Sequence, residues 1–257
     1  MDYEQFKKQV FALTKIDLNA YKEKQMKRRI DSLISKNGYS GYADYVAAIK
    51  DDIKLFEEFV NYLTINVSEF WRNPEQWTIL GEHILPELIK GSGNKLKIWS
   101  AACSTGDEPY SLVMLLSKFV PLSDIQIIAT DIDKQVLEKA ASGLYHEKSL
   151  AGLPKEFKEK FFTKIGSTSY QISDEIKRCV TFKQHNLLKD VYPSNFDLIV
   201  CRNVLIYFTD DAKFEIYKKF NKSLRSGGYL FIGSTEQIIN YKEINFSSFK
   251  SFFYRKN

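Results

Sequence analysis

The side chains best suited to chemistry lie in one short stretch, residues 100–110 (Ser-Ala-Ala-Cys-Ser-Thr-Gly-Asp-Glu-Pro-Tyr). An apolar run ends at residue 100 and a helix-like segment follows residue 110, so the stretch is predicted to join a strand to a helix. Ligands of doubly wound sheets sit at the carboxyl ends of strands, where small residues let them approach the main chain. We therefore expect a nucleotide-like ligand at this loop.

Two acids indicate what kind of ligand that is. The next apolar run ends at Asp131, about 25 residues after Gly106, where an acid typically accepts hydrogen bonds from ribose hydroxyls. Judged by position alone, an acid here is as suited to capping the next helix as to binding a ribose. We assign the capping role to Asp133 and the ribose-binding role to Asp131. The loop lacks G-x-G-x-x-G, and its acids disfavour a pyrophosphate. Glu108 suits a cationic group instead, such as the sulfonium and ammonium of S-adenosylmethionine.

The elements that must position these residues form an α/β domain. Short apolar runs separated mostly by helix-like stretches predict a parallel sheet with crossover helices. The last run, residues 249–255, leaves no room for a crossover helix and is predicted to be an antiparallel edge strand. The other predicted strands are residues 96–100, 125–130, 180–186, 196–201 and 229–233.

Two further regions flank or interrupt that sheet. Apolar residues such as Met26, Ile30 and Leu33 recur at helical spacing, so residues 1–75 are expected to form an all-helical domain ahead of the α/β domain at 76–257. The connection over about residues 145–178 is longer than an ordinary crossover loop. A helix-like segment and a hairpin signal at Gly166 predict a small inserted β-subdomain there.

Composition excludes several classes of protein. The 3 cysteines lack C-x-x-C spacing and the 3 histidines lack metal-binding spacing, so we expect no metal site. No apolar run approaches the roughly 18 residues of a membrane span and no export signal is evident, which predicts a cytoplasmic protein without membrane insertion. The net charge is +5, and basic residues are concentrated in 15–36, which suggests an acidic partner.

Three motifs resemble those of the chemotaxis receptor methyltransferases, the CheR family. They are residues 99–110, residues 129–133 (Ala-Thr-Asp-Ile-Asp) and residues 201–208 (Cys-Arg-Asn-Val-Leu-Ile-Tyr-Phe). The likeness continues through 63–72, 186–188 and 233–236, so it covers nearly the whole chain. It implies a Rossmann-like class I methyltransferase domain, S-adenosylmethionine as cofactor and S-adenosylhomocysteine as product. The implied substrates are glutamate side chains on the cytoplasmic domains of chemotaxis receptors, with no role for nucleic acid.

The resemblance also implies roles for single residues. Arg72 and Tyr207 match residues implicated in catalysis, although an arginine in a surface ion pair and a tyrosine in an apolar core are the more common readings of such residues. This chain has Asp107, Ser68 and Trp71 where glutamate, threonine and another aromatic are usual. Residues matching cofactor contacts are Asn66, Ser68 and Arg72 in the stretch between domains, Glu108 near the methionine part, Asp131 at the ribose, Asn186 and Leu187 near the adenosine, and Asn203 and Val204 after the strand at 196–201.

Lys24 and Arg28 lie one helical turn apart on the face opposite Met26 and Ile30. A solvated basic face is the ordinary explanation of such a pair, whereas the resemblance implies that this face binds the acidic methylation helices of receptors.

Two alternative functions remain open. One is a nucleic-acid methyltransferase, which is disfavoured because no Pro-Pro-aromatic motif follows residues 196–201 and no basic stripe is interleaved with aromatics. The other is a catalytically silent cofactor-binding regulatory module, which the presence of both Arg72 and Tyr207 disfavours.

Overall fold

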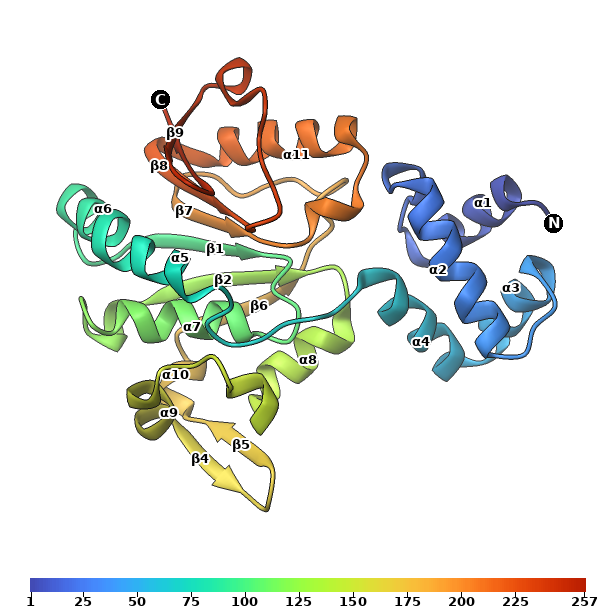
Figure 1. Cartoon of the computed structure of the whole chain (residues 1–257), viewed down its shortest axis with the longest axis horizontal. Helices are drawn as coiled ribbons and strands as arrows, with labels where there is room; N and C mark the ends of the chain where they lie inside the picture. Colours follow the sequence, from blue (N-terminus) through green and yellow to red (C-terminus); the bar gives the residue numbers. More distant parts are fainter. The chain divides into compact units, whose positions relative to one another are not determined.

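The computed structural model describes all 257 residues, and they form two compact units (Figure 1). The smaller unit comprises Met1–Asn66 and Leu205–Glu215, and the larger comprises Val67–Val204 and Ile216–Asn257. The division after Asn66 precedes the predicted boundary at residue 75, because Phe70 is already buried in the core of the larger unit. None of the helices is both long enough and apolar enough to cross a membrane.

The smaller unit is helical, as the sequence predicts. Asp2 and Gln5 form a capping box that starts its first helix, and Asp52 caps its fourth. Phe6, Tyr45 and Phe59 are fully buried and form its aromatic core. Its elements are α1 (Tyr3–Thr14), the 3-10 turn η1 (Leu18–Ala20), α2 (Glu23–Lys36), α3 (Tyr42–Asp51) and α4 (Ile53–Thr64).

A distant segment, Leu205–Glu215, is bound into this helical unit by its main chain. Lys22 N donates to Tyr207 O at 2.9 Å, and Thr209 N donates to Ala20 O at 2.8 Å. Between them Tyr21 and Phe208 form an antiparallel bridge, and their rings stack with centroids 4.6 Å apart. The 3-10 turn η5 (Leu205–Tyr207) therefore belongs with the helices.

The larger unit contains a seven-stranded sheet in the order β6-β2-β1-β7-β8-β10-β9. The first five strands in that order pair in parallel, and β10 is antiparallel to both β8 and β9. Every residue of β7 is buried, as expected of a strand covered on both faces. The strands are β1 (Lys97–Ala101), β2 (Gln126–Asp131), β6 (Val180–Gln184), β7 (Phe196–Cys201), β8 (Leu224–Ile232), β9 (Phe246–Lys250) and β10 (Phe253–Lys256).

The predicted mixed, mostly parallel sheet is therefore confirmed, but the expectation of a single final strand over 249–255 is wrong. The chain turns at Ser251 and Phe252, and Phe252 adopts a left-handed φ of 70°. Two strands result, and β9 becomes the edge of the sheet. No glycine, proline or asparagine marks this turn, so the local sequence contains no breaker signal.

Helices connect and flank these strands. α7 follows β1 and begins at Asp107, earlier than the helix-like pattern suggests. The helical elements are α5 (Pro74–Ile79), a π-helical turn η2 (Leu80–Ile84), α6 (Leu85–Ser92), α7 (Asp107–Leu116), α8 (Lys134–Ser142) and α11 (Asp210–Ser223), with short 3-10 turns η3 (Leu122–Asp124) and η6 (Tyr241–Ile244).

The inserted subdomain predicted between the strands at 125–130 and 180–186 is present (Figure 1, olive to yellow). Its sheet is antiparallel with the order β3-β5-β4, and Gly166 turns the hairpin with φ 65°. Its elements are β3 (Leu144–His146), η4 (Glu147–Leu150), α9 (Lys155–Phe161), β4 (Phe162–Ile165), β5 (Ser169–Ile172) and α10 (Asp174–Lys177).

Candidate active site at the carboxyl ends of the central strands

The loop after β1 folds against the end of β2. The two strands pair in parallel, which places Ala101 beside Thr130. Cys103 N donates to Thr130 O at 2.9 Å, and Ser104 N donates to the carboxylate of Asp131 at 2.8 Å. Ala102, Ser104 and Gly106 all have left-handed φ values, which glycine adopts without cost and other residues adopt only where their surroundings hold them. The loop thus makes a tight turn, and its hydrogen bonds hold it against Asp131 at the end of β2.

Asp131 is a buried carboxyl supported by main-chain donors. Only 6% of the residue is exposed, and Asp133 N donates to its other oxygen at 3.1 Å. Burial raises the pKa of Asp131 to about 6. Additional hydroxyl donors would stabilise its ionised form. Asp133 caps α8 by accepting a hydrogen bond from Gln135 N, so the predicted capping role is confirmed.

Glu108 lies in the first turn of α7 and has a cationic protein partner. Ser100 Oγ donates to its Oε1 at 2.8 Å, and Arg202 Nη1 lies 3.5 Å from its Oε2. Burial raises the pKa of Glu108, and the positive charge of Arg202 opposes that rise. Sequence reasoning missed Arg202, because an arginine directly after a strand has no local signal of burial.

The Arg202 guanidinium is enclosed by polar acceptors and aromatic faces. Only 2% of its side chain is exposed. Its Nη2 lies 2.7 Å from Arg72 O, 2.9 Å from Gln76 Oε1 and 3.2 Å from Asn73 Oδ1. The charged group lies over the ring of Phe231, 4.7 Å from the centroid. Arg202 therefore joins the end of β7 to the segment before α5.

That segment contains Ser68 and Arg72 and is packed into the larger unit. Phe70 is fully buried, and its N–H donates to Ser149 O at 3.0 Å. Trp71 N donates to Ser111 Oγ at 3.2 Å. The rings of Trp71 and Trp77 stack with centroids 5.0 Å apart, and Trp77 Nε1 donates to Arg72 O at 3.0 Å. The main chain around Arg72 is consequently held from several sides.

Ser68 lies beside another buried acid of the loop. Its hydroxyl lowers the pKa of Asp107, although burial is the larger effect and raises that pKa. Thr105 Oγ1 also donates to Asp107, at 2.6 Å. The structure thus brings Ser68, Arg72, Glu108 and Asp131 to one end of the sheet.

Asn203 begins the turn after β7 and is held by an acid that sequence reasoning missed. Asn203 has a left-handed φ of 59°. Its N–H and that of Gly233 both donate to Glu236 Oε2, at 2.9 and 2.7 Å. A Cβ at Gly233 would lie 2.7 Å from Asn203 N, so this close approach requires glycine. Glu236 therefore fixes the turn that contains Asn203 and Val204.

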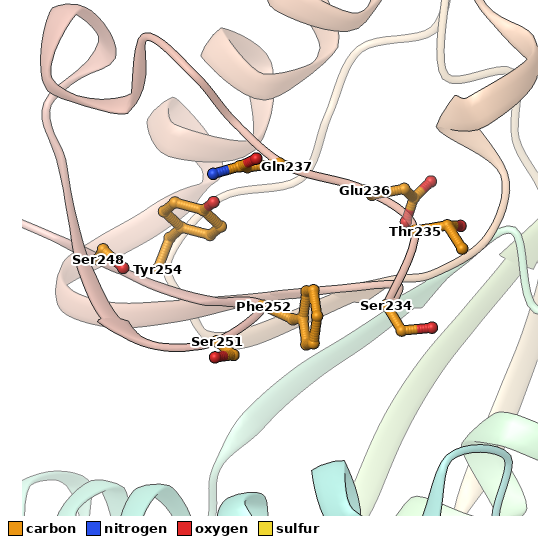
Figure 2. Close-up of a pocket in the computed structure, with 8 residues that line it drawn as sticks. All are labelled: Ser234, Thr235, Glu236, Gln237, Ser248, Ser251, Phe252 and Tyr254. Atoms are coloured by element: carbon orange, nitrogen blue, oxygen red, sulfur yellow. The ribbon is translucent and has the colours of Figure 1, made fainter.

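Glu236 also lines a pocket of about 470 Å³ between the loop after β8 and the β9–β10 hairpin (Figure 2). Tyr254 Oη accepts a hydrogen bond from Ile238 N at 3.1 Å and so links the two walls. The lining residues are Ser234, Thr235, Glu236, Gln237, Ser248, Ser251, Phe252 and Tyr254.

Asn186 and Leu187 follow β6, beside β2. His185 N donates to Asp131 O at 2.9 Å, which ties this turn to the end of β2. Asn186 Oδ1 accepts a hydrogen bond from Leu188 N at 2.9 Å, and Leu187 is buried. These two predicted contacts therefore lie next to Asp131.

The remaining candidate residues belong to the helical unit. Asn66 Nδ2 donates to Thr64 Oγ1 at 2.8 Å, and Tyr207 lies in η5. Lys24 and Arg28 are exposed on α2, whereas Met26 and Ile30 are buried, so the predicted polar and apolar faces of that helix are present.

The charges at the sheet end suit a cationic ligand. Three carboxyls, those of Asp107, Glu108 and Asp131, lie at the loop with the single buried guanidinium of Arg202. This balance disfavours a pyrophosphate and favours a group that carries positive charge, while Asp131 offers acceptors for a ribose. The residues present fit S-adenosylmethionine. No His, Cys, Asp and Glu side chains are grouped to hold a metal ion.

Comparison with known proteins agrees with this chemistry. Residues 1–64 match the family model of the CheR methyltransferase all-alpha domain, and residues 66–253 match that of the CheR methyltransferase SAM binding domain. The chain is 43% identical to the chemotaxis protein methyltransferases of Listeria innocua and Listeria monocytogenes, covering 99% of this chain and 97% of each relative. The corresponding protein of Borreliella burgdorferi is 32% identical, with 90% of this chain and 86% of the relative covered. The chain belongs to the CheR family of chemotaxis methyltransferases, and S-adenosylmethionine is its cofactor.

Proposed function

We propose that this protein methylates glutamate side chains on the cytoplasmic domains of chemotaxis receptors and so forms glutamate methyl esters. The observation that best supports this choice is the rigid support of Arg72, whose carbonyl accepts hydrogen bonds from both Arg202 and Trp77 beside the cofactor acid Glu108. A guanidinium with a fixed main chain is suited to orienting a carboxylate acceptor, because its planar donors match both carboxylate oxygens.

Methylation of a glutamate carboxylate requires no proton transfer by the protein. When bound, S-adenosylmethionine supplies a methyl group on a positively charged sulfur, which leaves as a neutral thioether as the acceptor oxygen bonds to the methyl carbon. A glutamate side chain is ionised at neutral pH, so no general base has to remove a proton. The protein's task is to align the acceptor oxygen and exclude water.

Individual residues divide that task. Arg72 orients the acceptor carboxylate, and Tyr207 supplies a second donor or packs near the methyl group. Asp131 accepts hydrogen bonds from the ribose, and Glu108 faces the cationic methionine part. The further cofactor contacts in this proposal are Asn66, Ser68, Asn186, Leu187, Asn203 and Val204.

The acceptor is proposed to bind the basic face of α2. Lys24 and Arg28 are both exposed there. Receptor methylation segments are acidic, so these two cations would attract them through long-range charge complementarity.

Incubation with methyl-labelled cofactor and a receptor cytoplasmic fragment tests the proposal. Alkali should release the label as methanol, because esters hydrolyse under these conditions, and a fragment with glutamine at the acceptor positions should take up less label. Alkali-stable label on added nucleic acid would instead identify a nucleic-acid methyltransferase. Cofactor binding with no transfer to either substrate would identify a regulatory module.

A further inference from the structure

Arg202 makes contacts that an ordinary stabilising ion pair does not need. Its Nη2 is shared among Arg72 O, Asn73 Oδ1 and Gln76 Oε1, all in the segment before or at the start of α5. Only Nη1 points to a carboxylate, that of Glu108, at the long distance of 3.5 Å. A guanidinium arranged for ion pairing would use two parallel hydrogen bonds to the carboxylate. Here three of its four hydrogen bonds go to the stretch from Arg72 to Gln76.

The segment held by Arg202 has left-handed backbone on both sides of Arg72. Trp71 and Asn73 have left-handed φ values of 59° and 60°. A bulky side chain such as tryptophan adopts this conformation at a cost, and such residues persist only where the surroundings over-determine them. Arg72 O, which lies between these two left-handed residues, receives one hydrogen bond from Arg202 and another from Trp77 Nε1.

The same guanidinium reaches the cofactor loop. Glu108 begins α7 and is hydrogen-bonded by Ser100 at the end of β1, so its carboxylate is itself fixed. Arg202 lies between that carboxylate and the carbonyl of Arg72, packed over Phe231 and Trp77. One rigid side chain therefore sets the distance between two elements that are far apart in the sequence.

We propose that Arg202 is a positioning residue for methyl transfer, which fixes the main chain of Arg72 relative to Glu108 and so aims the Arg72 side chain. This inference rests on the roles proposed above for Arg72 and Glu108. Arg202 does not touch substrate in this scheme, because its side chain is almost fully buried. Its effect on turnover passes through Arg72.

Substitution of Arg202 by lysine separates its charge from its shape. In Arg202→Lys a cation remains near Glu108, but one ammonium cannot reproduce the planar fork that spans both elements. We expect kcat on a receptor fragment to fall about a hundredfold, since small misplacement of an orienting group has effects of that size. The Kd for S-adenosylhomocysteine should change by no more than about threefold, because the charge opposite Glu108 is retained. Arg202→Gln should weaken both quantities.

Arg225→Gln is the matched control. Arg225 is a part-buried arginine of the same unit that pairs with Asp197, at the opposite end of the sheet. This variant should lower the melting temperature yet keep kcat and Kd per folded molecule. The proposal is overturned if Arg202→Lys keeps its kcat, or if its loss of activity equals that of Arg225→Gln at matched stability.

Near-ultraviolet circular dichroism tests the positioning without any methyl acceptor. The stacked Trp71–Trp77 pair, with planes inclined by 18°, reports the conformation of the segment. The dichroism signal of this pair should change in Arg202→Lys and stay the same in Arg225→Gln. This result does not depend on methyl transfer, so a wild-type protein that is inactive on receptor fragments would contradict only the proposed function. An unchanged signal in Arg202→Lys overturns the proposal.

If the Arg202 variants fail to fold, Gln76→Leu provides a second test, because it removes one acceptor of Arg202. It should alter the same dichroism signal and lower kcat by a larger factor than it raises the Kd for S-adenosylhomocysteine. If neither the dichroism signal nor kcat changes, the proposal is overturned.

Discussion

Near each end of the central strands β1 and β7 lies an acid paired with an arginine, but the two acids are supported differently. At the amino end Asp197 accepts hydrogen bonds from Lys97 N at 2.7 Å, Ser92 Oγ at 2.6 Å and Arg225 Nε. At the carboxyl end Glu108 has one short hydrogen bond and a 3.5 Å contact with Arg202. The amino-end acid is fully provided with donors by the protein itself.

The carboxyl end also accumulates acids whose charge the fold does not fully support. Burial raises the pKa values of Asp107, Glu108 and Asp131 by more than their hydrogen bonds and neighbouring charges lower them. Perturbed acids of this kind concentrate at functional sites, whereas a saturated acid serves stability. The comparison teaches that one sheet uses the same residue types for structure at one end and for ligand chemistry at the other.

The largest expected effect concerns stability and belongs to the amino end. Asp197→Ala should lower the free energy of unfolding by about 3 kcal/mol, because Lys97 N, Ser92 Oγ and the part-buried Arg225 guanidinium lose their shared acceptor. Denaturant titration measures this change. The Kd for S-adenosylhomocysteine per folded molecule should stay constant, and a large increase in Kd would break the distinction between the two ends.

The next largest effect concerns turnover and belongs to the carboxyl end. Arg72→Ala should reduce kcat about a hundredfold at saturating cofactor and receptor fragment, because the acceptor carboxylate loses its orienting donors. Stability should change little, since the Arg72 side chain is only half-buried while its carbonyl remains available to Arg202. Unchanged turnover would exclude Arg72 from the reaction.

Asp131→Asn should weaken binding of S-adenosylhomocysteine about tenfold, as expected for loss of a charge-assisted hydrogen bond. Calorimetry measures the affinity. Asn at this position keeps the size of the side chain, so the loop after β1 should remain folded. Equal affinity in the variant and the wild type would remove Asp131 from the cofactor site.

The same acid should make cofactor affinity depend on pH. With a pKa of about 6, Asp131 is largely ionised at pH 7 and mostly protonated at pH 5. Affinity should therefore fall about tenfold from pH 7 to pH 5 in the wild type, because the protonated group accepts fewer hydrogen bonds. The profile should flatten in Asp131→Asn, and an identical profile in both proteins would contradict this assignment.

Stability of the cofactor-free protein should respond in the opposite sense. The carboxyl of Asp131 has a pKa of 3.8 in the unfolded chain and about 6 in the folded protein. Between pH 3.8 and pH 6 the folded protein therefore binds more protons than the unfolded chain. Its contribution to stability is present below pH 3.8 and is lost as the pH rises through 6. Urea titrations of wild type and Asp131→Asn across this range measure the difference.

The smallest expected effect lies outside both ends of the sheet, on α2. Reversing the charge of Lys24 and Arg28 together should raise KM for a receptor fragment severalfold at low salt, with less effect at high salt because exposed charges are screened. Cofactor affinity should not change. A KM that is the same at every salt concentration would argue against this face as the docking surface.

Sequence patterns predicted much of this fold because the central strands are buried on both faces. β7 matches its predicted range of 196–201, and β1, β2 and β6 begin or end within two residues of theirs. β8 begins at Leu224, before the predicted start at residue 229, because its pairing with β7 is interrupted around Gly227, which has a left-handed φ of 75°, and resumes at Tyr229. The turn at Phe252 was not predicted because no glycine, proline or asparagine occurs there.

The sequence by itself determined the local parts of the site. It places small residues and acids after one strand, an acid after the next, and an Arg-Asn-Val turn after a third, and these follow from residue type and short-range spacing alone. Its likeness to one family then indicates the cofactor.

Only the tertiary structure decided which of these residues work together. Arg202 lies 94 positions from Glu108 and 130 from Arg72, and Glu236 lies 33 positions from Asn203. The rest of the chain determines by its packing whether an arginine or glutamate is exposed to solvent or is buried and holds two segments together. Strand pairing and helix packing bring those distant elements together, and no local pattern contains that information.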